Sequence, residues 1–148
     1  MGDFSIDNFG AIVASVLTLL GFYVTYRIYY KTRFNRAASA FRSTVLAELQ
    51  GIYPVTQYWD MNIFPKFAAS VFKIESAAEE FKFVLRCKTE FESAVKEYRD
   101  YCKTITWNQE AAWTLYPTSR KPGDVSPRDK FSHIVDRLLS FTVDKRTS

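Results

Sequence analysis

The sequence predicts an all-α protein in which an N-terminal single transmembrane helix is followed by a small antiparallel helical bundle. Residues 8–26 form a run of 19 without a charged side chain, and about 20 apolar residues cross the hydrocarbon core of a bilayer. After that run, apolar residues recur at helical spacing through most of the chain. The 148 residues are 47% hydrophobic and 24% charged, which suits one packed domain with an appendage and argues against disorder.

The predicted transmembrane helix covers residues 8–30 and follows a short extracytoplasmic tail, residues 1–7. The side chain of Arg27 can extend outward, so the buried length can continue to Tyr30. Aromatic residues gather near both ends of the run, as they do at membrane–water interfaces. A cleaved export signal would carry basic residues before its apolar core, whereas Asp3 and Asp7 stand there. A soluble core helix of this length would show a broader polar stripe.

Basic residues follow the span directly, and no acidic residue occurs between Asp7 and Glu48. Loops rich in Lys and Arg stay on the cytoplasmic side of a membrane. We therefore expect a single-pass protein of the cell inner membrane, with its N-terminus outside and its C-terminal domain in the cytoplasm. The basic and aromatic residues expected at the membrane interface, where they can contact membrane lipid, are Tyr26, Arg27, Tyr29, Tyr30, Lys31, Arg33 and Arg36.

One face of the span carries small residues at steps of three and four. Small side chains let two helix backbones approach closely, and hydroxyl groups can form hydrogen bonds across such an interface. This face is a candidate contact with a second copy or with another membrane protein, although small residues are common in membrane helices in any case. Its members are Gly10, Ala14, Thr18, Gly21 and Thr25.

Residues 31–50 are predicted to continue as a basic juxtamembrane helix. One apolar stripe runs along it, and Gly51 and Pro54 are expected to end it. The connector that follows contains large apolar residues and is expected to pack on the bundle. The stripe consists of Phe34, Ala38, Phe41, Val45 and Leu49.

The region from Lys66 to Tyr116 contains neither Gly nor Pro. Its apolar stripe shifts register near residues 85–89, which indicates either a stutter in one helix or a junction of two helices. We favour one long helix. The main argument against it is that residues 71–76 and 81–86 show short alternating stretches, which are typical of strands. The first register is Phe64, Phe67, Val71, Ile74, Ala78, Phe81 and Leu85, and the second is Val84, Cys87, Phe91, Ala94, Tyr98, Tyr101 and Ile105.

The cytoplasmic helical domain, residues 51–142, is predicted to contain a loop at 117–126 and a final helix. Ser126 suits the N-cap, Pro127 the first helical position, and Asp129 the third residue after the cap. Residues 143–148 form a polar tail. The apolar face of the final helix is Phe131, Ile134, Val135, Leu138 and Leu139.

No constellation of catalytic residues is recognisable. His133 is the single histidine, and Cys87 and Cys102 would lie about 22 Å apart on one helix, too far for a disulfide. Too few His and Cys residues occur for a zinc site, and phosphate-binding and nucleophile motifs are absent. We therefore expect no enzymatic activity, no cofactor and no bound metal. The basic cluster abuts an apolar span, so nucleic acid is not an expected partner.

Two groups of aromatic residues are candidates for a partner surface, namely Tyr58 with Trp59, and Trp107 with Trp113. Buried aromatic residues would instead be core, which we expect more often in a small bundle. The function expected from these features is a non-enzymatic scaffold or partner-binding module at the cytoplasmic membrane face. The alternative is a self-assembling membrane effector, pore-forming or holin-like, that forms homo-oligomers through its transmembrane helix.

Overall fold

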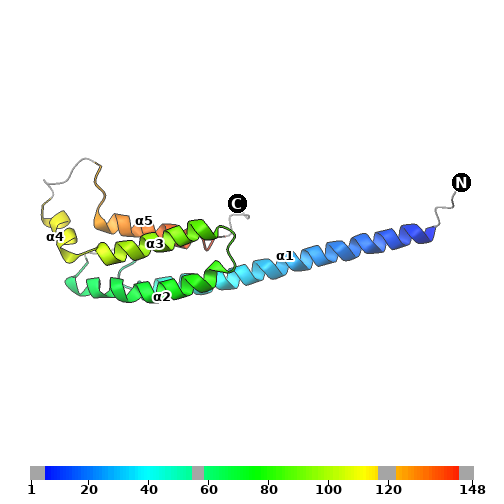
Figure 1. The fold of residues 1–148 in the computed structure, drawn as a ribbon, viewed down its shortest axis with the longest axis horizontal. Coiled ribbons are helices and arrows are strands. Elements are labelled where there is room, and N and C mark those ends of the chain that lie inside the picture. The colour runs from blue at the N-terminus through cyan, green and yellow to red at the C-terminus, as the bar shows by residue number, and fades with distance from the viewer. Residues whose placement is uncertain (1–5, 55–58, 117–122, 144–148) are drawn as a thin grey trace. The chain divides into compact units, whose positions relative to one another are not determined.

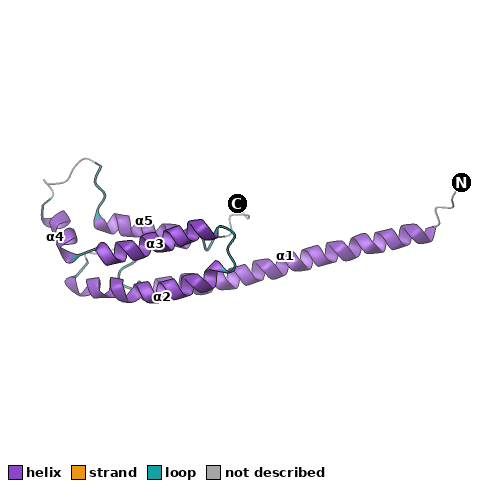
Figure 2. Cartoon of the chain, viewed as in Figure 1, coloured by secondary structure: helices purple, strands orange, loops and turns teal. Residues whose placement is uncertain are grey.

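The structure is a computed structural model that describes residues 6–54, 59–116 and 123–143, with side chains from residue 10 onward. Its elements are α1 (Ile6–Glu48), the 3-10 helix η1 (Met61–Ile63), α2 (Phe64–Lys82), α3 (Lys88–Thr104), α4 (Trp107–Leu115) and α5 (Pro127–Ser140). These described ranges contain helices and turns and no strand (Figure 2). The predicted all-α class is confirmed, and the alternating stretches at 71–76 and 81–86 are not strands.

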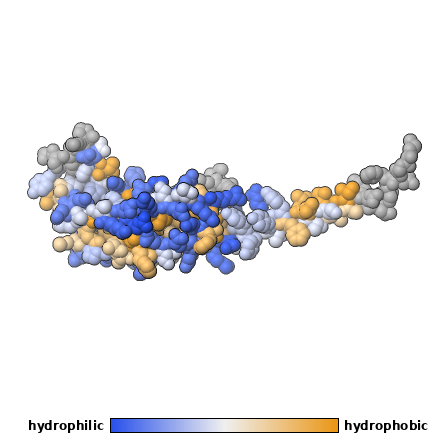
Figure 3. Space-filling model, viewed as in Figure 1, coloured by the Kyte–Doolittle hydropathy of each residue, from blue (hydrophilic) through white to orange (hydrophobic). Residues whose placement is uncertain are grey.

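The chain divides into two units, residues 1–35 and residues 36–148, and α1 contributes to both. In the first unit, α1 is apolar and its side chains from Gly10 to Tyr29 are exposed. Figure 3 shows hydrophobic side chains along this part of α1, whereas hydrophilic side chains predominate on the same view of the second unit. By length and composition, this helix is long and apolar enough to cross a membrane.

The second unit is a bundle in which α2 runs antiparallel to α1, α3 to α2, and α5 to α3. Figure 1 shows α3 beside α5 and α4 at one end of the bundle. Phe41 of α1 stacks on Phe81 of α2 with ring centroids 5.0 Å apart. Lys73 forms an ion pair with Glu48 at 2.9 Å, so α1 runs opposite to α2. Between α3 and α5, Arg137 pairs with Glu97.

Aromatic rings fill the bundle at two levels. At one level, Phe41, Phe81 and Phe91 meet, with centroids 5.0–5.5 Å apart. At the other, Phe131 lies 5.0 Å from Phe67 and 5.5 Å from Trp59. Phe41 and Phe81 are stacked and the other pairs are edge-to-face, and both arrangements stabilise beyond the area that they bury. The stripe predicted on α1 is confirmed, because Ala38, Phe41, Val45 and Leu49 are buried and Phe34 is half-buried.

Of the two alternatives for residues 64–105, the favoured single helix is wrong and the junction of two helices is confirmed. α2 ends at Lys82 and α3 begins at Lys88, so the register shift marks a junction of two helices. The backbone N–H groups of Val84 and Leu85 donate to the carbonyls of Phe81 and Lys82, which tightens the last turn of α2. Both side chains are buried, with 8% and 7% exposed. Burial of two successive apolar residues therefore turns the chain here without Gly or Pro.

A second break separates α3 from α4 at Ile105 and Thr106, whose backbones are extended. The side-chain oxygen of Gln109 accepts a hydrogen bond from the Thr106 N–H at 3.1 Å. Thr followed three residues later by Gln is a helix-start signature, so the sequence carries a signal for this break that the apolar stripe does not. α4 brings Trp107 against Phe64, with centroids 5.9 Å apart.

The predicted final helix is confirmed as α5. Ser126 is its N-cap, and its hydroxyl accepts from the Asp129 N–H at 3.0 Å. The predicted apolar face, from Phe131 to Leu139, is buried in full. Gly123 has a positive φ of 96°, consistent with the predicted loop at 117–126. Residues 117–122 and 144–148 of the predicted loop and tail lie outside the described residues.

Candidate functional site: an exposed helix face and a groove between α2 and α3

The predicted small-residue face of α1 is exposed. The Thr18 hydroxyl donates to the Ala14 carbonyl and the Thr25 hydroxyl to the Gly21 carbonyl, each at 2.8 Å. A Cβ added at Gly10 or Gly21 would meet no atom within 4 Å. The face is therefore open to a neighbour. Its two hydroxyl groups, however, already form hydrogen bonds within their own helix.

The predicted membrane-interface residues follow on the same helix. Tyr26, Arg27 and Tyr29 are exposed, as are the three basic residues Lys31, Arg33 and Arg36, and Tyr30 is half-buried. The Arg27 Nε donates to the Tyr23 hydroxyl at 3.1 Å, and the guanidinium lies 5.5 Å from the centre of that ring. This cation–π contact stabilises the Arg27 charge. Arg27 lies at the point where the helix composition changes from apolar to basic.

Among the aromatic residues considered for a partner surface, burial excludes Trp59. Trp59 is a core residue with 3% of its surface exposed, packed on Phe67 and Phe131. Its indole N–H points to the Ile52 carbonyl at 3.4 Å. Trp107 is 38% exposed and Trp113 is half-buried, whereas Tyr58 lies outside the described residues. Trp59 is thus unavailable to a partner, because the connector folds back onto the bundle.

A groove of about 810 Å³ lies between α2 and α3. Ala78 and Phe91 contribute buried side chains to it, and Val95 is half-buried. Phe72 also lines it and is 79% exposed. The sequence alone does not predict this groove. Phe72 lies outside the apolar stripe of α2, and only the antiparallel packing of two separate helices places it beside α3.

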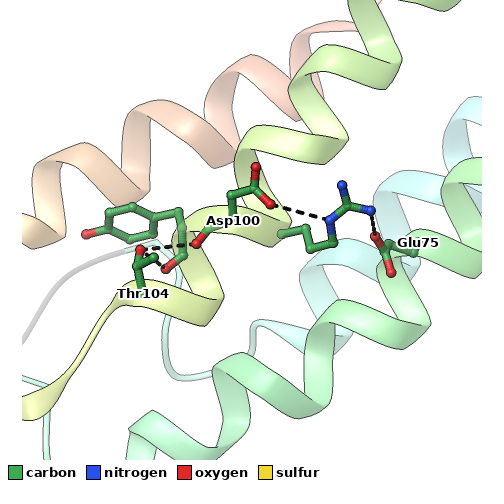
Figure 4. A network of polar contacts seen from close by, with 5 residues as sticks. Glu75, Asp100 and Thr104 are labelled. Atoms are coloured by element: carbon green, nitrogen blue, oxygen red, sulfur yellow. Dashed lines mark hydrogen bonds and ion pairs between the residues drawn. The ribbon is translucent and has the colours of Figure 1, made fainter.

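Charged side chains that line this groove are organised by ion pairs between the two helices. Arg99 donates to Glu75 at 3.0 Å and lies 3.5 Å from Asp100 on its own helix (Figure 4). Lys82 pairs with Glu92 of α3 and, at 3.6 Å, with Glu79 of α2. The hydrogen bond to Glu92 raises the pKa of Lys82. The groove thus combines an apolar floor with a charged rim of both signs.

A buried carboxylate lies outside this groove, where α4 meets α5. Glu110 is 2% exposed, and one of its oxygens lies 2.8 Å from the Arg128 Nε. Desolvation raises the pKa of Glu110, while the charge of Arg128 opposes that shift. Burial likewise raises the pKa of nearby Tyr101, whose hydroxyl donates to the Pro127 carbonyl at 2.5 Å. These contacts join α3 and α4 to the start of α5.

The titratable residues singled out in the sequence are dispersed. His133 is exposed on α5. Cys87 is exposed at the start of α3, Cys102 is buried, and both are free thiols. Burial raises the pKa of Cys102 to about 12. Within the described ranges, no three His, Cys, Asp or Glu side chains are grouped so that they could hold a metal ion.

Comparison of the chain with protein-family models, curated proteins and solved structures gives no match. Function must therefore be inferred from the residues and contacts of the chain itself. Two features stand out in the described residues, namely the exposed apolar part of α1 and the groove between α2 and α3.

Proposed function

We propose that the protein is a non-enzymatic, single-pass membrane protein whose helical bundle binds or scaffolds a partner at the cytoplasmic face of the inner membrane. One observation carries this proposal: the apolar part of α1 exposes its side chains along its length. Soluble monomers rarely expose contiguous apolar surface of this extent. A lipid environment supplies the burial that the chain itself does not.

The charge distribution supports the orientation. Five basic residues occupy positions 27–42 and no acidic residue lies between Asp7 and Glu48, so the positive-inside tendency places the bundle in the cytoplasm. The two free thiols agree with a reducing compartment. Fused after Ser148, a reporter that works only in the cytoplasm should be active. Activity of a reporter that works only outside the membrane would show that the topology is inverted.

Partner binding is assigned to the groove between α2 and α3. Its apolar floor and its rim of both charge signs suit an amphipathic helix of another protein, a common mode of recognition. Phe72→Glu should then reduce copurification of that partner, because it places a charge where an apolar contact is expected. Met61→Glu is a matched control, since Met61 is 64% exposed and lies outside the groove.

The anchor is tested by washing membranes with alkaline carbonate. Intact protein should remain in the pellet, and its release into the supernatant would refute the anchor. Gentle solubilisation followed by identification of copurifying proteins tests the scaffold role. A chain that is strictly monomeric and alone at native expression levels would refute that role even if the anchor holds.

A second candidate function, the self-assembling membrane effector, is supported by the open space at Gly10 and Gly21. In that case Gly10→Leu together with Gly21→Leu should abolish growth arrest on overexpression, because bulky side chains prevent close helix packing. Unchanged arrest would argue against it. The proposal of a scaffold is preferred, because Thr18 and Thr25 already donate to carbonyls of their own helix.

A further inference from the structure

The turn between α2 and α3 presents an aromatic side chain to solvent. Phe83 is 75% exposed, and Arg86, Cys87 and Lys88 after it are exposed as well. Most phenylalanines in the second unit are buried instead. The turn is also held in place, because Val84 and Leu85 between these residues are buried in the core. Phe83 is thus displayed on a packed turn.

This turn lies at the end of the bundle where the chain enters from the apolar segment. Phe41, near the start of the second unit, packs against Phe81 before the turn and Phe91 after it, with centroids 5.0 and 5.5 Å apart. Phe141, just after α5, lies 5.3 Å from Phe91 at the same level. In Figure 1 the α2–α3 connection and the end of α5 lie at the same end of the bundle.

The covalent chain keeps this end near any bilayer that holds the apolar segment. Five residues separate Tyr30, the last residue of the predicted span, from Arg36, the first of the second unit. Even fully extended, the six Cα–Cα steps from Tyr30 to Arg36 cover only about 20 Å. A surface at this end of the bundle can therefore reach lipid headgroups.

The side chains at this end have the chemistry of a membrane interface. Arg36, Arg42, Arg86 and Lys88 are exposed, and basic residues near a membrane are attracted to anionic lipids. Glu90 in the first turn of α3 is the exposed acid nearest in sequence to Lys88. An exposed aromatic ring beside basic residues is a frequent combination in segments that lie at the headgroup level.

We propose that the α2–α3 turn is a second membrane contact, in which Phe83 enters the headgroup region and Arg86 and Lys88 bind anionic phospholipid. This inference rests on the proposed membrane anchor and goes beyond it, because it docks the bundle itself on the lipid surface. Residues far from the apolar segment in sequence thereby fix which side of the bundle faces the bilayer. The groove between α2 and α3 is left to a protein partner.

The test uses the full chain labelled at native Cys87 with an environment-sensitive fluorophore. The protein is reconstituted in phosphatidylcholine vesicles with and without phosphatidylglycerol at about one lipid in three, and quenching by nitroxide-labelled headgroups is measured. Cys87 should be quenched several-fold more in the anionic vesicles. A control label at Met61→Cys in a Cys87→Ser chain lies at the opposite end of α2 and should remain unquenched in both vesicles.

Two sets of substitutions separate the charge contribution from the aromatic one. Arg86→Glu with Lys88→Glu should remove the dependence on phosphatidylglycerol, and Phe83→Ser should reduce quenching in the anionic vesicles. Phe72→Ser is the matched aromatic control, because Phe72 is 79% exposed but lies in the middle of α2. Equal quenching at Cys87 and position 61, or equal quenching in both vesicle types, would overturn the proposal. If the fluorescence of the Cys87 label changed with protein concentration and not with lipid, the turn would contact protein, and the proposal would be overturned as well.

Failure of the anchor is recognised separately by flotation. Protein that floats with both vesicle types after alkaline washing retains the anchor, whatever the label at Cys87 reports. Flotation only with phosphatidylglycerol, abolished by salt and by Arg86→Glu with Lys88→Glu, would support the turn contact and refute the anchor. Protein that floats with neither vesicle type would refute both.

Discussion

Cys87 and Cys102 lie at opposite ends of α3 in contrasting environments. Cys87 is the N-cap residue and exposed, whereas Cys102 is buried with 5% of its surface exposed. Desolvation raises the pKa of Cys102 to about 12, so its reactive thiolate form is scarce at neutral pH. Since the thiolate is the nucleophile, the burial of Cys102 and its raised pKa both lower its reactivity.

We therefore expect a maleimide at neutral pH to modify Cys87 rapidly in the folded protein and Cys102 only after unfolding. Mass spectrometry of peptides from samples labelled with and without urea measures this difference. Labelling of both cysteines at equal rates without denaturant would contradict the burial of Cys102.

Glu110 predicts a pH dependence of stability. Its pKa is raised above the ordinary value of 4.5, mainly by desolvation. A carboxyl group with a raised pKa in the folded state contributes stability below its unfolded pKa, and that contribution is lost as pH rises through the folded pKa. Relative to Glu110→Gln, the wild type should therefore lose free energy of unfolding as the pH rises above the ordinary carboxyl pKa of 4.5.

Urea unfolding of both proteins at several pH values measures this loss. Arg128→Gln provides a control, because removing the opposing positive charge should enlarge the loss. A difference between wild type and Glu110→Gln that does not change with pH would show that Glu110 keeps an ordinary pKa.

At the scale of elements, periodicity predicted the helices that contribute a single apolar stripe to the core. The faces of α5 and of the last part of α1 agree with the sequence residue by residue, because each helix packs on one side. The α2–α3 junction was visible as a register shift, but the absence of Gly and Pro argued for continuity. The chain turns here because Val84 and Leu85 are buried, and their burial depends on contacts with residues distant in sequence.

The candidate site was less predictable than the fold. The apolar run in α1 follows from composition alone, since a charge-free run of this length is readable without coordinates, whereas its exposure is a property of the structure. The groove between α2 and α3 was not, because Phe72 and Val95 come together only once α2 and α3 are antiparallel. For Trp59 the sequence favoured a core position over a partner surface, and the contacts with Phe67 and Phe131, which are distant in sequence, decide that it is buried.

Docking of α1 on the bundle predicts a large effect at Phe41. Its side chain is 2% exposed and contacts the rings of Phe81 and Phe91. Phe41→Ala should lower the free energy of unfolding by about 3–5 kcal/mol, measured by urea titration in mild detergent. Phe72→Ala is the matched exposed change and should alter it by less than about 0.5 kcal/mol. Equal effects at the two positions would show that α1 is not part of the core.

At the scale of the whole molecule, the two units should respond independently to substitution. Leu17 and Leu20 are exposed, at 63% and 54%, in the first unit. A lysine near the centre of a membrane helix costs about 2.5–3.5 kcal/mol. Leu17→Lys with Leu20→Lys should therefore move the protein out of the carbonate-resistant membrane fraction, while the urea midpoint of the bundle in mild detergent stays unchanged.

Leu17→Val with Leu20→Val keeps the segment apolar and should remain in the membrane pellet. If the lysine variant also resisted carbonate, the apolar part of α1 would not be the anchor. A loss of bundle stability in the lysine variant would instead show that the two units are coupled.

The apolar stripe of α1 packs against helices that follow it in the chain, which has a consequence for biosynthesis. The stripe ending at Leu49 leaves the ribosome about 40 residues before Phe91 of α3, one of its contact residues. At roughly 5–20 residues per second, this amounts to roughly 2–8 seconds. During that interval the nascent chain exposes an apolar stripe that helices synthesised later will cover. Insertion machinery or a ribosome-associated chaperone has that window in which to shield it.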